Sequence, residues 1–257
     1  MEAAIKKRAV ITENVNIIQD VFSMWIAAED IAGSAVPGQF VLLYCNDGSR
    51  LLPRPVSICE IDRKNGRIRL VYRIVGNGTK EFSLLDTGDT LEVMGPLGNG
   101  FHPEGTKALL IGGGIGIPPL LALAKQLQIK MDMVLGFRDV TFLDDEFTTY
   151  GKVYISTEDG STGTKGNVLD AIREHSLSAD IIYACGPTPM LRAVQAFALE
   201  NGIKAQLSLE ERMACGIGAC LGCICKTREV DQHTNVKNKR VCKDGPVFYA
   251  DETSVKK

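Results

Sequence analysis

Four cysteines near the C-terminus constrain the fold of this 257-residue chain more than any other feature of its sequence. Cys215, Cys220 and Cys223 follow the spacing C-x4-C-x2-C, and Cys242 comes after residues 224–241. Four thiolates at a similar spacing can hold a [2Fe–2S] cluster. Glycines stand between the first three cysteines, where the backbone has to bend around a bulky inorganic core. The spacing therefore favours an iron–sulfur cluster.

Other uses of these cysteines remain open from the spacing alone. Soft thiolates also bind zinc, although the usual zinc ribbon has two C-x2-C pairs and the second pair is missing here. The thiols could also be free or joined in disulfides. Cys225 is an additional thiol in the same segment. It could replace Cys223 as a ligand, and we interpret it as a bystander.

The composition is that of a globular chain with two or three compact units. Hydrophobic residues make up 45% of the sequence and the formal net charge is −2, which indicates neither disorder nor a nucleic-acid partner. The N-terminus resembles no secretory leader, and the apolar run 108–124 is too short and too rich in glycine and proline to span a membrane. Cys45, Cys59 and Cys185 are far from one another in the sequence. This pattern suits a protein of a reducing compartment better than one held together by disulfides. We therefore expect no membrane association and a cytoplasmic location.

The first part of the chain predicts a β-barrel. Short runs rich in β-branched and apolar residues alternate with turn signals such as Pro37-Gly38 and Asn65-Gly66. The runs span residues 9–17, 21–27, 39–44, 54–61, 67–75 and 90–98. Six short strands at this spacing imply a small closed antiparallel barrel, to which we assign residues 1–104.

Near Lys107 the pattern changes, and strands begin to alternate with helices. We expect strands at residues 108–111, 132–137, 152–157, 180–185 and 204–210, and helices at residues 118–128, 167–174 and 190–201. Such alternation is typical of a doubly wound parallel sheet, with the last strand at its far edge. Residues 105–210 thus form an α/β domain. Residues 211–257 form a small cysteine module that its metal centre would stabilise.

Two glycine-containing turns follow strands of the α/β domain. Residues 112–120 (GGGIGIPPL) lie between a strand and a helix, and residues 185–191 (CGPTPML) repeat this arrangement at a second strand. The N-terminus of each helix offers free N–H groups and a partial positive charge to a pyrophosphate. Either turn alone could be a tight strand–helix connection. Two at the same edge of one sheet predict a nucleotide crevice.

The predicted barrel contains a comparable pair of motifs. Residues 54–57 (RPVS) and 72–79 (YRIVGNGT) each supply an arginine, and the second motif continues into a glycine-rich turn. An arginine can bind a diphosphate bidentately. An arginine beside a proline is also a device that protects an edge strand from pairing. Taken together, the two motifs indicate a second diphosphate site.

Together these motifs resemble those of the ferredoxin–NADP reductase superfamily. The resemblance covers the whole chain and is carried by RPxS, the following GxGT, GGGxGxPP after a strand, and CGPxPM. It implies that the barrel binds FAD and that the α/β domain binds a nicotinamide nucleotide. The ending SLEERMACGIGACLGCICK…VCKDGPVF is similar to the electron-transfer subunits of NAD-linked dihydroorotate dehydrogenases and narrows the resemblance to them.

The resemblance also implies roles for individual residues. Ser57 would lie near the isoalloxazine of FAD and Arg54 on its phosphate, while Cys185 would approach the nicotinamide. The residues implied for FAD are Arg54, Pro55, Val56, Ser57, Val71, Tyr72, Arg73, Gly78 and Thr79. Those implied for the nucleotide are Gly112, Gly113, Gly114, Gly116, Cys185 and Gly186, and those for the cluster are Cys215, Cys220, Cys223 and Cys242. No catalytic acid or base is expected, because the cofactors carry the chemistry.

The nucleotide is expected to be NAD. Strand 152–157 runs into Glu158 and Asp159, and carboxylates favour a plain ribose over a 2′-phosphate. Arg138 and Lys165 leave NADP open.

The predicted function is an electron relay in which the nucleotide exchanges a hydride with FAD, and FAD exchanges single electrons with the cluster. The resemblance implies a partner, an FMN-containing dihydroorotate dehydrogenase catalytic subunit of pyrimidine biosynthesis, in a hetero-oligomer such as a heterotetramer. A reductase subunit for a sulfide-, hydrogenase- or oxygenase-type partner would use the same cofactors. A zinc-binding regulator with a nucleotide-sensing fold is a rival of another class.

Overall fold

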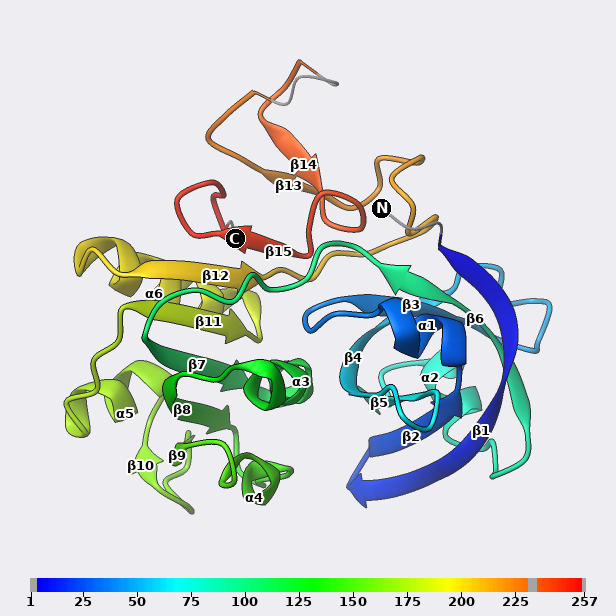
Figure 1. The fold of residues 1–257 in the computed structure, drawn as a ribbon, viewed down its shortest axis with the longest axis horizontal. Helices are drawn as coiled ribbons and strands as arrows, with labels where there is room; N and C mark the ends of the chain where they lie inside the picture. The colour runs from blue at the N-terminus through cyan, green and yellow to red at the C-terminus, as the bar shows by residue number, and fades with distance from the viewer. Residues whose placement is uncertain (1–3, 231–234, 256–257) are drawn as a thin grey trace.

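The computed structural model describes residues 4–230 and 235–255, which form three parts in mutual contact. Figure 1 shows a barrel on one side, a helix-flanked sheet on the other, and the C-terminal module above their junction. In the described residues no helix is long and apolar enough to cross a membrane. The apolar run 108–124 instead contributes a buried strand and most of a helix.

Six antiparallel strands close the N-terminal barrel in the order β1-β2-β5-β4-β3-β6. They are β1 (Ile5–Ile18), β2 (Val21–Ala27), β3 (Phe40–Tyr44), β4 (Arg54–Asp62), β5 (Arg67–Arg73) and β6 (Thr90–Leu97), with helices α1 (Glu29–Ser34) and α2 (Asn77–Phe82) between them. Alternation directs one set of side chains inward, so that Ile68 and Leu70 of β5 are fully buried in the barrel core. The predicted barrel is confirmed.

The second part is a seven-stranded sheet with the order β10-β9-β8-β7-β11-β12-β15. Its strands are β7 (Lys107–Gly113), β8 (Lys130–Phe137), β9 (Lys152–Thr157), β10 (Thr164–Lys165), β11 (Ile181–Cys185), β12 (Lys204–Ser208) and β15 (Val247–Tyr249). Its helices are η1 (Gly114–Gly116), α3 (Pro118–Gln126), α4 (Asp144–Phe147), α5 (Val168–Glu174) and α6 (Thr188–Glu200). Side chains of α3 and α4 share one apolar cluster and those of α5 and α6 another. Helices therefore cover both faces, as a doubly wound fold requires.

The far edge of this sheet differs from the prediction. The strand over residues 204–210 was expected at the edge, but β12 pairs antiparallel with β15, with Gln206 opposite Tyr249 and Ser208 opposite Val247. A strand of three residues carries too short a pattern to be recognised by periodicity. The C-terminal module therefore shares a sheet with the α/β domain.

The module also packs against the barrel. Strands β13 (Ile224–Lys226) and β14 (Asn238–Arg240) form a small antiparallel pair. One apolar cluster joins barrel side chains to those of the module, and its buried members are Phe40, Leu42, Leu97, Cys223, Cys225, Val241, Cys242 and Phe248. A side chain at Gly216 would place its Cβ 2.4 Å from Leu42 Cδ1, so the cysteine loop lies directly on β3. The described residues of the module thus share their apolar cluster with the barrel.

Replacing Phe248 by Ala should therefore destabilise the barrel as well as the module. Loss of a buried aromatic side chain costs about 3–5 kcal/mol of unfolding free energy. The measurement is urea unfolding followed by the fluorescence of Trp25, the single tryptophan, which lies on β2 of the barrel. The exposed Val236→Ala is the control. An unchanged Trp25 transition in the Phe248 variant would show that the module and the barrel unfold independently.

Candidate cofactor sites

Residues of all three parts line one cavity. The carboxyl ends of the parallel strands point toward the barrel (Figure 1), so this edge of the sheet borders the cavity. The barrel contributes Phe40, Pro55, Val56, Ser57, Val71, Tyr72, Arg73, Val75 and Thr79 to its wall. The α/β domain contributes Gly113, Ile115, Gly116, Pro119, Cys185, Gly186, Pro187 and Ser208, and the C-terminal segment contributes Leu209, Glu210, Glu211, Met213 and Pro246. Ligands bind at this edge of open α/β sheets, so the cavity lies where a nucleotide is expected.

Two glycine turns of the α/β domain touch each other at this edge. A Cβ at Gly116 would lie 2.5 Å from the Gly186 nitrogen and 2.5 Å from the Cys185 carbonyl oxygen. A Cβ at Gly113 would lie 2.5 Å from Met190 Sδ in the first turn of α6. Only glycine allows this backbone approach, which brings the turn after β7 and the N-terminus of α6 to one point. The two turns could therefore hold one dinucleotide together.

On the barrel side, an arginine lies over a glycine turn. A Cβ at Gly78 would be 2.1 Å from Arg54 Nε, so the guanidinium crosses α2 where a side chain would otherwise stand. The Thr79 hydroxyl accepts hydrogen bonds from the N–H groups of Val75 (2.9 Å) and Gly76 (3.3 Å) and fixes the turn. This juxtaposition of a cation and a tight turn fits a diphosphate.

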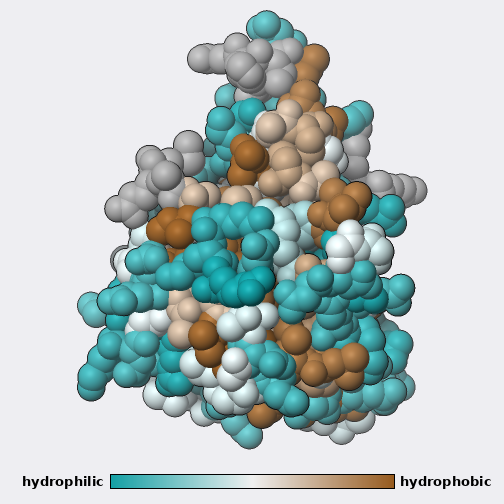
Figure 2. Space-filling model, turned by 90° about the vertical axis from the view of Figure 1, so that its right-hand side faces the viewer, coloured by the Kyte–Doolittle hydropathy of each residue, from teal (hydrophilic) through white to brown (hydrophobic). Residues whose placement is uncertain are grey.

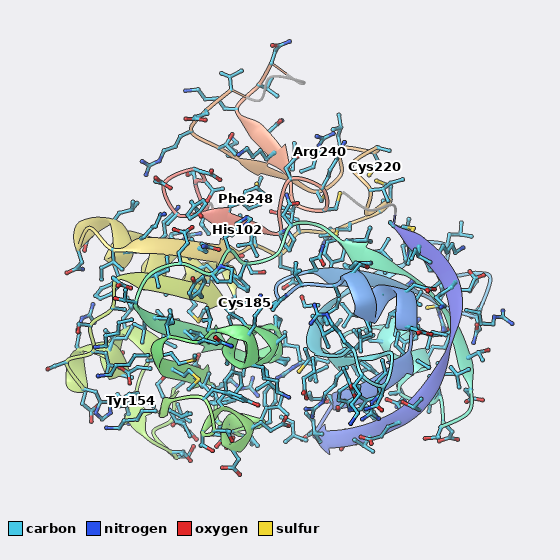
Figure 3. The ribbon with its side chains drawn as sticks, in the orientation of Figure 1. His102, Tyr154, Cys185, Cys220, Arg240 and Phe248 are labelled. Carbon is cyan, nitrogen blue, oxygen red and sulfur yellow. The ribbon has the colours of Figure 1, made fainter. Side chains whose placement is uncertain are left out.

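Cys185 lies at the end of β11, near the middle of the molecule and away from the cysteines of the module (Figure 3). Burial raises the pKa of its thiol to about 12, although a hydrogen bond with Ser208 acts in the opposite direction. The thiol is therefore protonated and neutral at physiological pH. Such a group can contact an apolar ring but cannot act as a nucleophile.

Most of the residues predicted to bind FAD or the nucleotide line the cavity. Gly78 lies beside the cavity because it precedes Thr79, which lines it, and Arg54 lies over Gly78. Gly112 does not face it: a Cβ there would meet Ile117 Cγ1 at 2.8 Å, so this glycine serves the packing of α3 on the strand. At Gly114, φ is +52° and the space around the Cβ position is open.

Sequence reasoning did not assign Glu210, Glu211 or Met213 to this cavity. They follow β12 and line the cavity on the way to the first cysteine of the module. Their segment belongs to the SLEERM sequence, which is separated by Ala214 from the first predicted cluster cysteine. Its position depends on the docking of the module, which the sequence does not reveal.

The four predicted cluster cysteines lie in two pairs. The Cys220 N–H donates to Cys215 Sγ at 3.4 Å, and the Cys242 N–H donates to Cys223 Sγ at 3.4 Å. A [2Fe–2S] cluster takes two thiolates on each iron, so the paired arrangement fits it. Within the described residues, no three His, Cys, Asp or Glu side chains converge on one metal ion. A binuclear cluster does not require such convergence.

Backbone N–H groups surround the first of these thiols. Burial opposes the charge on Cys215, but N–H donors from Ile217, Cys220 and Ala219 lower its pKa to about 6. Donors of this kind stabilise a thiolate, and they would also donate to the ligand sulfur when a cluster is bound. Burial raises the pKa of Cys225 to about 11, and its charged neighbours are Glu211 and Lys239. Its interpretation as a bystander stays a prediction.

Arg240 connects the two halves of the cysteine site. Its Nη1 donates to the Gly218 carbonyl at 3.3 Å, in the loop between Cys215 and Cys220. Its Nε and Nη2 donate to Asp244 at 2.9 and 3.0 Å, in the turn that follows Cys242. The guanidinium, labelled in Figure 3, thus ties the loop of one pair to the turn of the other.

The fold and these sites define a class of protein, the flavin- and nicotinamide-linked iron–sulfur oxidoreductases. Three family models match the chain in order. They describe an oxidoreductase FAD-binding domain at residues 2–102, an oxidoreductase NAD-binding domain at residues 110–196, and the iron–sulfur cluster binding domain of dihydroorotate dehydrogenase B at residues 210–254. The chain belongs to the family of electron transfer subunits of dihydroorotate dehydrogenase B (NAD(+)). The iron–sulfur interpretation is thereby confirmed over zinc.

Curated relatives match over nearly their full length. The electron transfer subunit from Fusobacterium nucleatum subsp. nucleatum is 45% identical over 259 residues, covering 95% of this chain and 97% of that one. The subunit from Caldanaerobacter subterraneus subsp. tengcongensis is 44% identical, covering 96% and 98%. Among solved structures, one described for flavin-based electron bifurcation in the NADH-dependent reduced ferredoxin-NADP oxidoreductase superposes with a TM-score of 0.86 at 32% identity, covering 96% of this chain and 89% of that chain.

Gly78→Ala should weaken FAD binding. The new methyl group would displace Arg54, and loss of a charge-assisted hydrogen bond of about 1.5–3 kcal/mol lowers affinity roughly ten- to hundredfold. Fluorescence titration of the deflavinated chain with FAD measures this. Gly76→Ala is the matched control, because nothing lies within 4 Å of its Cβ position and its φ of −175° suits any residue. Equal affinities of the two variants would remove Arg54 and Gly78 from the flavin site.

Proposed function

We propose that this chain relays electrons between NAD and a partner enzyme through FAD and a [2Fe–2S] cluster, and that the partner oxidises dihydroorotate. The observation that carries the proposal is the shared cavity. Its wall combines the flavin turn of the barrel, the glycine turns of the α/β domain and the segment leading to the cysteines. The proposed flavin and nucleotide sites therefore share one cavity, and the segment that leads to the proposed cluster ligands forms part of its wall.

Bound FAD supplies the conversion between a two-electron hydride and single electrons, and the cluster carries one electron at a time. The residues of the chain bind and orient. We assign the nucleotide to the touching turns at Gly116 and Gly186, with Cys185 as a neutral wall beside the nicotinamide. We assign the flavin ring to the strand ends at Ser57 and Val71, across the same cavity. None of these groups moves a proton.

The cluster ligands are proposed to be Cys215, Cys220, Cys223 and Cys242. The paired N–H···S contacts support this set, and so does the family model over residues 210–254. NAD is proposed as the nucleotide, supported by the carboxylates that follow β9 at Glu158 and Asp159 and by the name of the matching domain.

An FMN-containing catalytic subunit, in a heterotetramer, is proposed as the partner, and the cytoplasm as the location. Cys220 is exposed, and so are the side chains of Ile217, Leu221 and Ile224 around it. Figure 2 shows brown and tan residues gathered in the upper part of the molecule, which is the C-terminal module. An apolar surface beside an exposed cluster ligand suits a docked electron donor.

A second candidate partner follows from the solved structures. The likeness to the ferredoxin-NADP oxidoreductase chain supports a subunit that serves another redox enzyme with the same cofactors. The higher identity of the dihydroorotate dehydrogenase relatives, 45% against 32%, favours dihydroorotate. A neighbouring gene for an FMN-dependent dihydroorotate dehydrogenase would distinguish the two cheaply.

The relay is tested by the visible spectrum of the anaerobically purified chain, expressed with and without a dihydroorotate dehydrogenase catalytic chain. We expect flavin bands with an added iron–sulfur shoulder, both bleached by NADH. With the catalytic chain present, dihydroorotate should bleach them too. A colourless protein that contains zinc would contradict the relay. Bleaching by NADH without any response to dihydroorotate would favour the other partner.

Cys220→Ser should abolish the iron–sulfur shoulder and reduce bound iron to near zero while FAD stays bound, because the ligand lies in the cysteine loop and not in the barrel. Iron analysis and electron paramagnetic resonance of the reduced protein measure this outcome. Cys225→Ser is the control and should keep its iron. Iron loss in the Cys225 variant would make that thiol a ligand. Loss of both cofactors in the Cys220 variant would show that the two sites depend on each other.

A further inference from the structure

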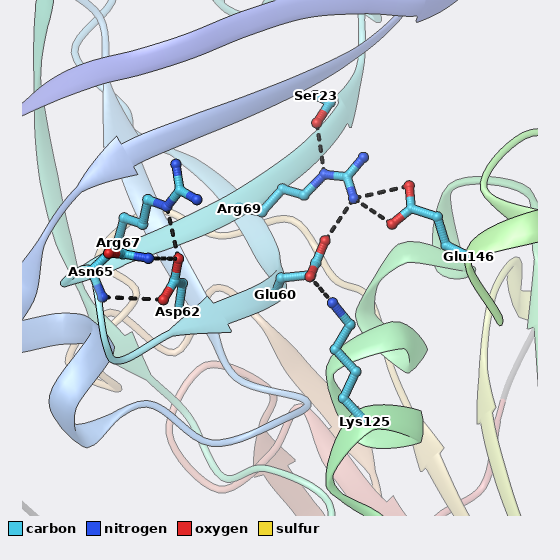
Figure 4. A network of polar contacts seen from close by, with 8 residues as sticks. All are labelled: Ser23, Glu60, Asp62, Asn65, Arg67, Arg69, Lys125 and Glu146. Atoms are coloured by element: carbon cyan, nitrogen blue, oxygen red, sulfur yellow. Dashed lines mark hydrogen bonds and ion pairs between the residues drawn. The ribbon is translucent and has the colours of Figure 1, made fainter. Parts of the chain in front are cut away.

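A charged network crosses the boundary between the barrel and the α/β domain (Figure 4), and none of its residues lines the cavity. Arg69 of β5 contacts Glu60 of β4 at 2.6 Å and Glu146 of α4 at 2.7 Å. Lys125, in the last turn of α3, forms an ion pair with the other oxygen of Glu60. Two of these ion pairs, Arg69–Glu146 and Lys125–Glu60, therefore join one domain to the other.

The barrel side of the network is buried, whereas its partners from the α/β domain, Glu146 and Lys125, have side chains that are 37% and 39% exposed. The side chains of Arg69 and Glu60 are each only 11% exposed. The Arg69 Nε donates to Ser23 Oγ at 2.8 Å, and its Nη1 donates to both Glu60 and Glu146. Burial opposes the charge of Arg69, but its hydrogen bonds to Glu146 and Glu60 raise its pKa, so it stays a cation. Exposed ion pairs contribute little, whereas a buried guanidinium held by two carboxylates fixes geometry.

The elements that this network ties together also form the cavity. The first residues of β4 and the last residues of β5 supply the flavin wall, and Pro119 in the first turn of α3 belongs to the opposite wall. At 1.5 Å per helical residue and about 3.3 Å per strand residue, the ion-pair residues lie about 7 to 10 Å from those walls along the same elements. Between them, α3 packs on β4 through an apolar cluster that includes Cys59 and Leu121.

We propose that Arg69, with Glu146 and the Glu60–Lys125 pair, is a positioning device that sets the separation of the flavin wall from the nicotinamide wall. Apolar packing between α3 and β4 holds the two domains together. Because the hydrophobic effect is non-directional, this packing alone does not fix how far α3 can shift along β4. The Arg69 guanidinium is restricted in orientation, because its Nε donates to Ser23 while its Nη1 donates to Glu60 and Glu146. Arg69 touches neither cofactor site, so its effect on the reaction would pass through the domain boundary alone. The inference rests on the proposed hydride exchange in this cavity.

The test is the anaerobic reduction of the flavin by NADH in a rapid-mixing spectrometer, with the full chain loaded with FAD and iron. In Glu146→Gln, we expect the rate at saturating NADH to fall by about tenfold or more, since a misplacement of about 1 Å costs up to about a hundredfold. The NADH concentration at half-maximal rate, the FAD content and the iron content should stay near those of the unaltered chain. Asp145→Asn is the matched control, because it makes the same change of charge at an exposed neighbour on α4.

Arg69→Lys keeps the charge but replaces two separate donor nitrogens, Nε on Ser23 and Nη1 on the carboxylates, by one, so it should lower the saturating rate as well. If Glu146→Gln and Arg69→Lys both reduce the flavin at the rate of the control, the positioning role is wrong. A lower thermal stability with an unchanged saturating rate would likewise show a merely structural role. If the unaltered chain itself is not reduced by NADH, the proposed function fails instead, and the two failures are distinguishable.

Discussion

The contact of the C-terminal module with both other domains is the constraint on which the rest of the structure depends. Leu42 of the barrel lies against Gly216, and β15 extends the sheet of the α/β domain beyond β12. A segment of this size cannot bury enough apolar surface alone, so it uses theirs. The segment that leads from β12 to the cysteines lines the cavity, so the docking of the module also brings the proposed cluster ligands close to the proposed flavin and nucleotide sites.

Glycine makes the close approaches that the sites require. Gly116 and Gly186 place two strand–helix turns in backbone contact, and Gly78 leaves room for the guanidinium of Arg54. Each of these positions would clash with a side chain, so the residue type follows from the geometry. At Gly112 the missing side chain makes room for Ile117, the residue before α3.

Charge and burial are distributed according to the chemistry of each site. Cys185 is buried and protonated, whereas Cys215 receives N–H donors that favour its thiolate. The same principle of compensation holds at the domain boundary, where Arg69 is buried only together with two carboxylates. Buried charges need partners with fixed geometry, and the molecule uses that requirement where two domains have to be held in register.

The sequence by itself determined the elements and the ligand types. The alternation in residues 67–75 and the glycine turns at 112–120 and 185–191 involve only neighbouring residues. They can therefore be recognised from the sequence alone. The tertiary structure decided what came together. Residues 247–249 pair as an edge strand, Glu210 and Glu211 reach the cavity, and Glu60, Arg69, Lys125 and Glu146 meet across the domain boundary. These contacts join segments far apart in the chain, and their geometry depends on how whole domains pack, which no local pattern encodes.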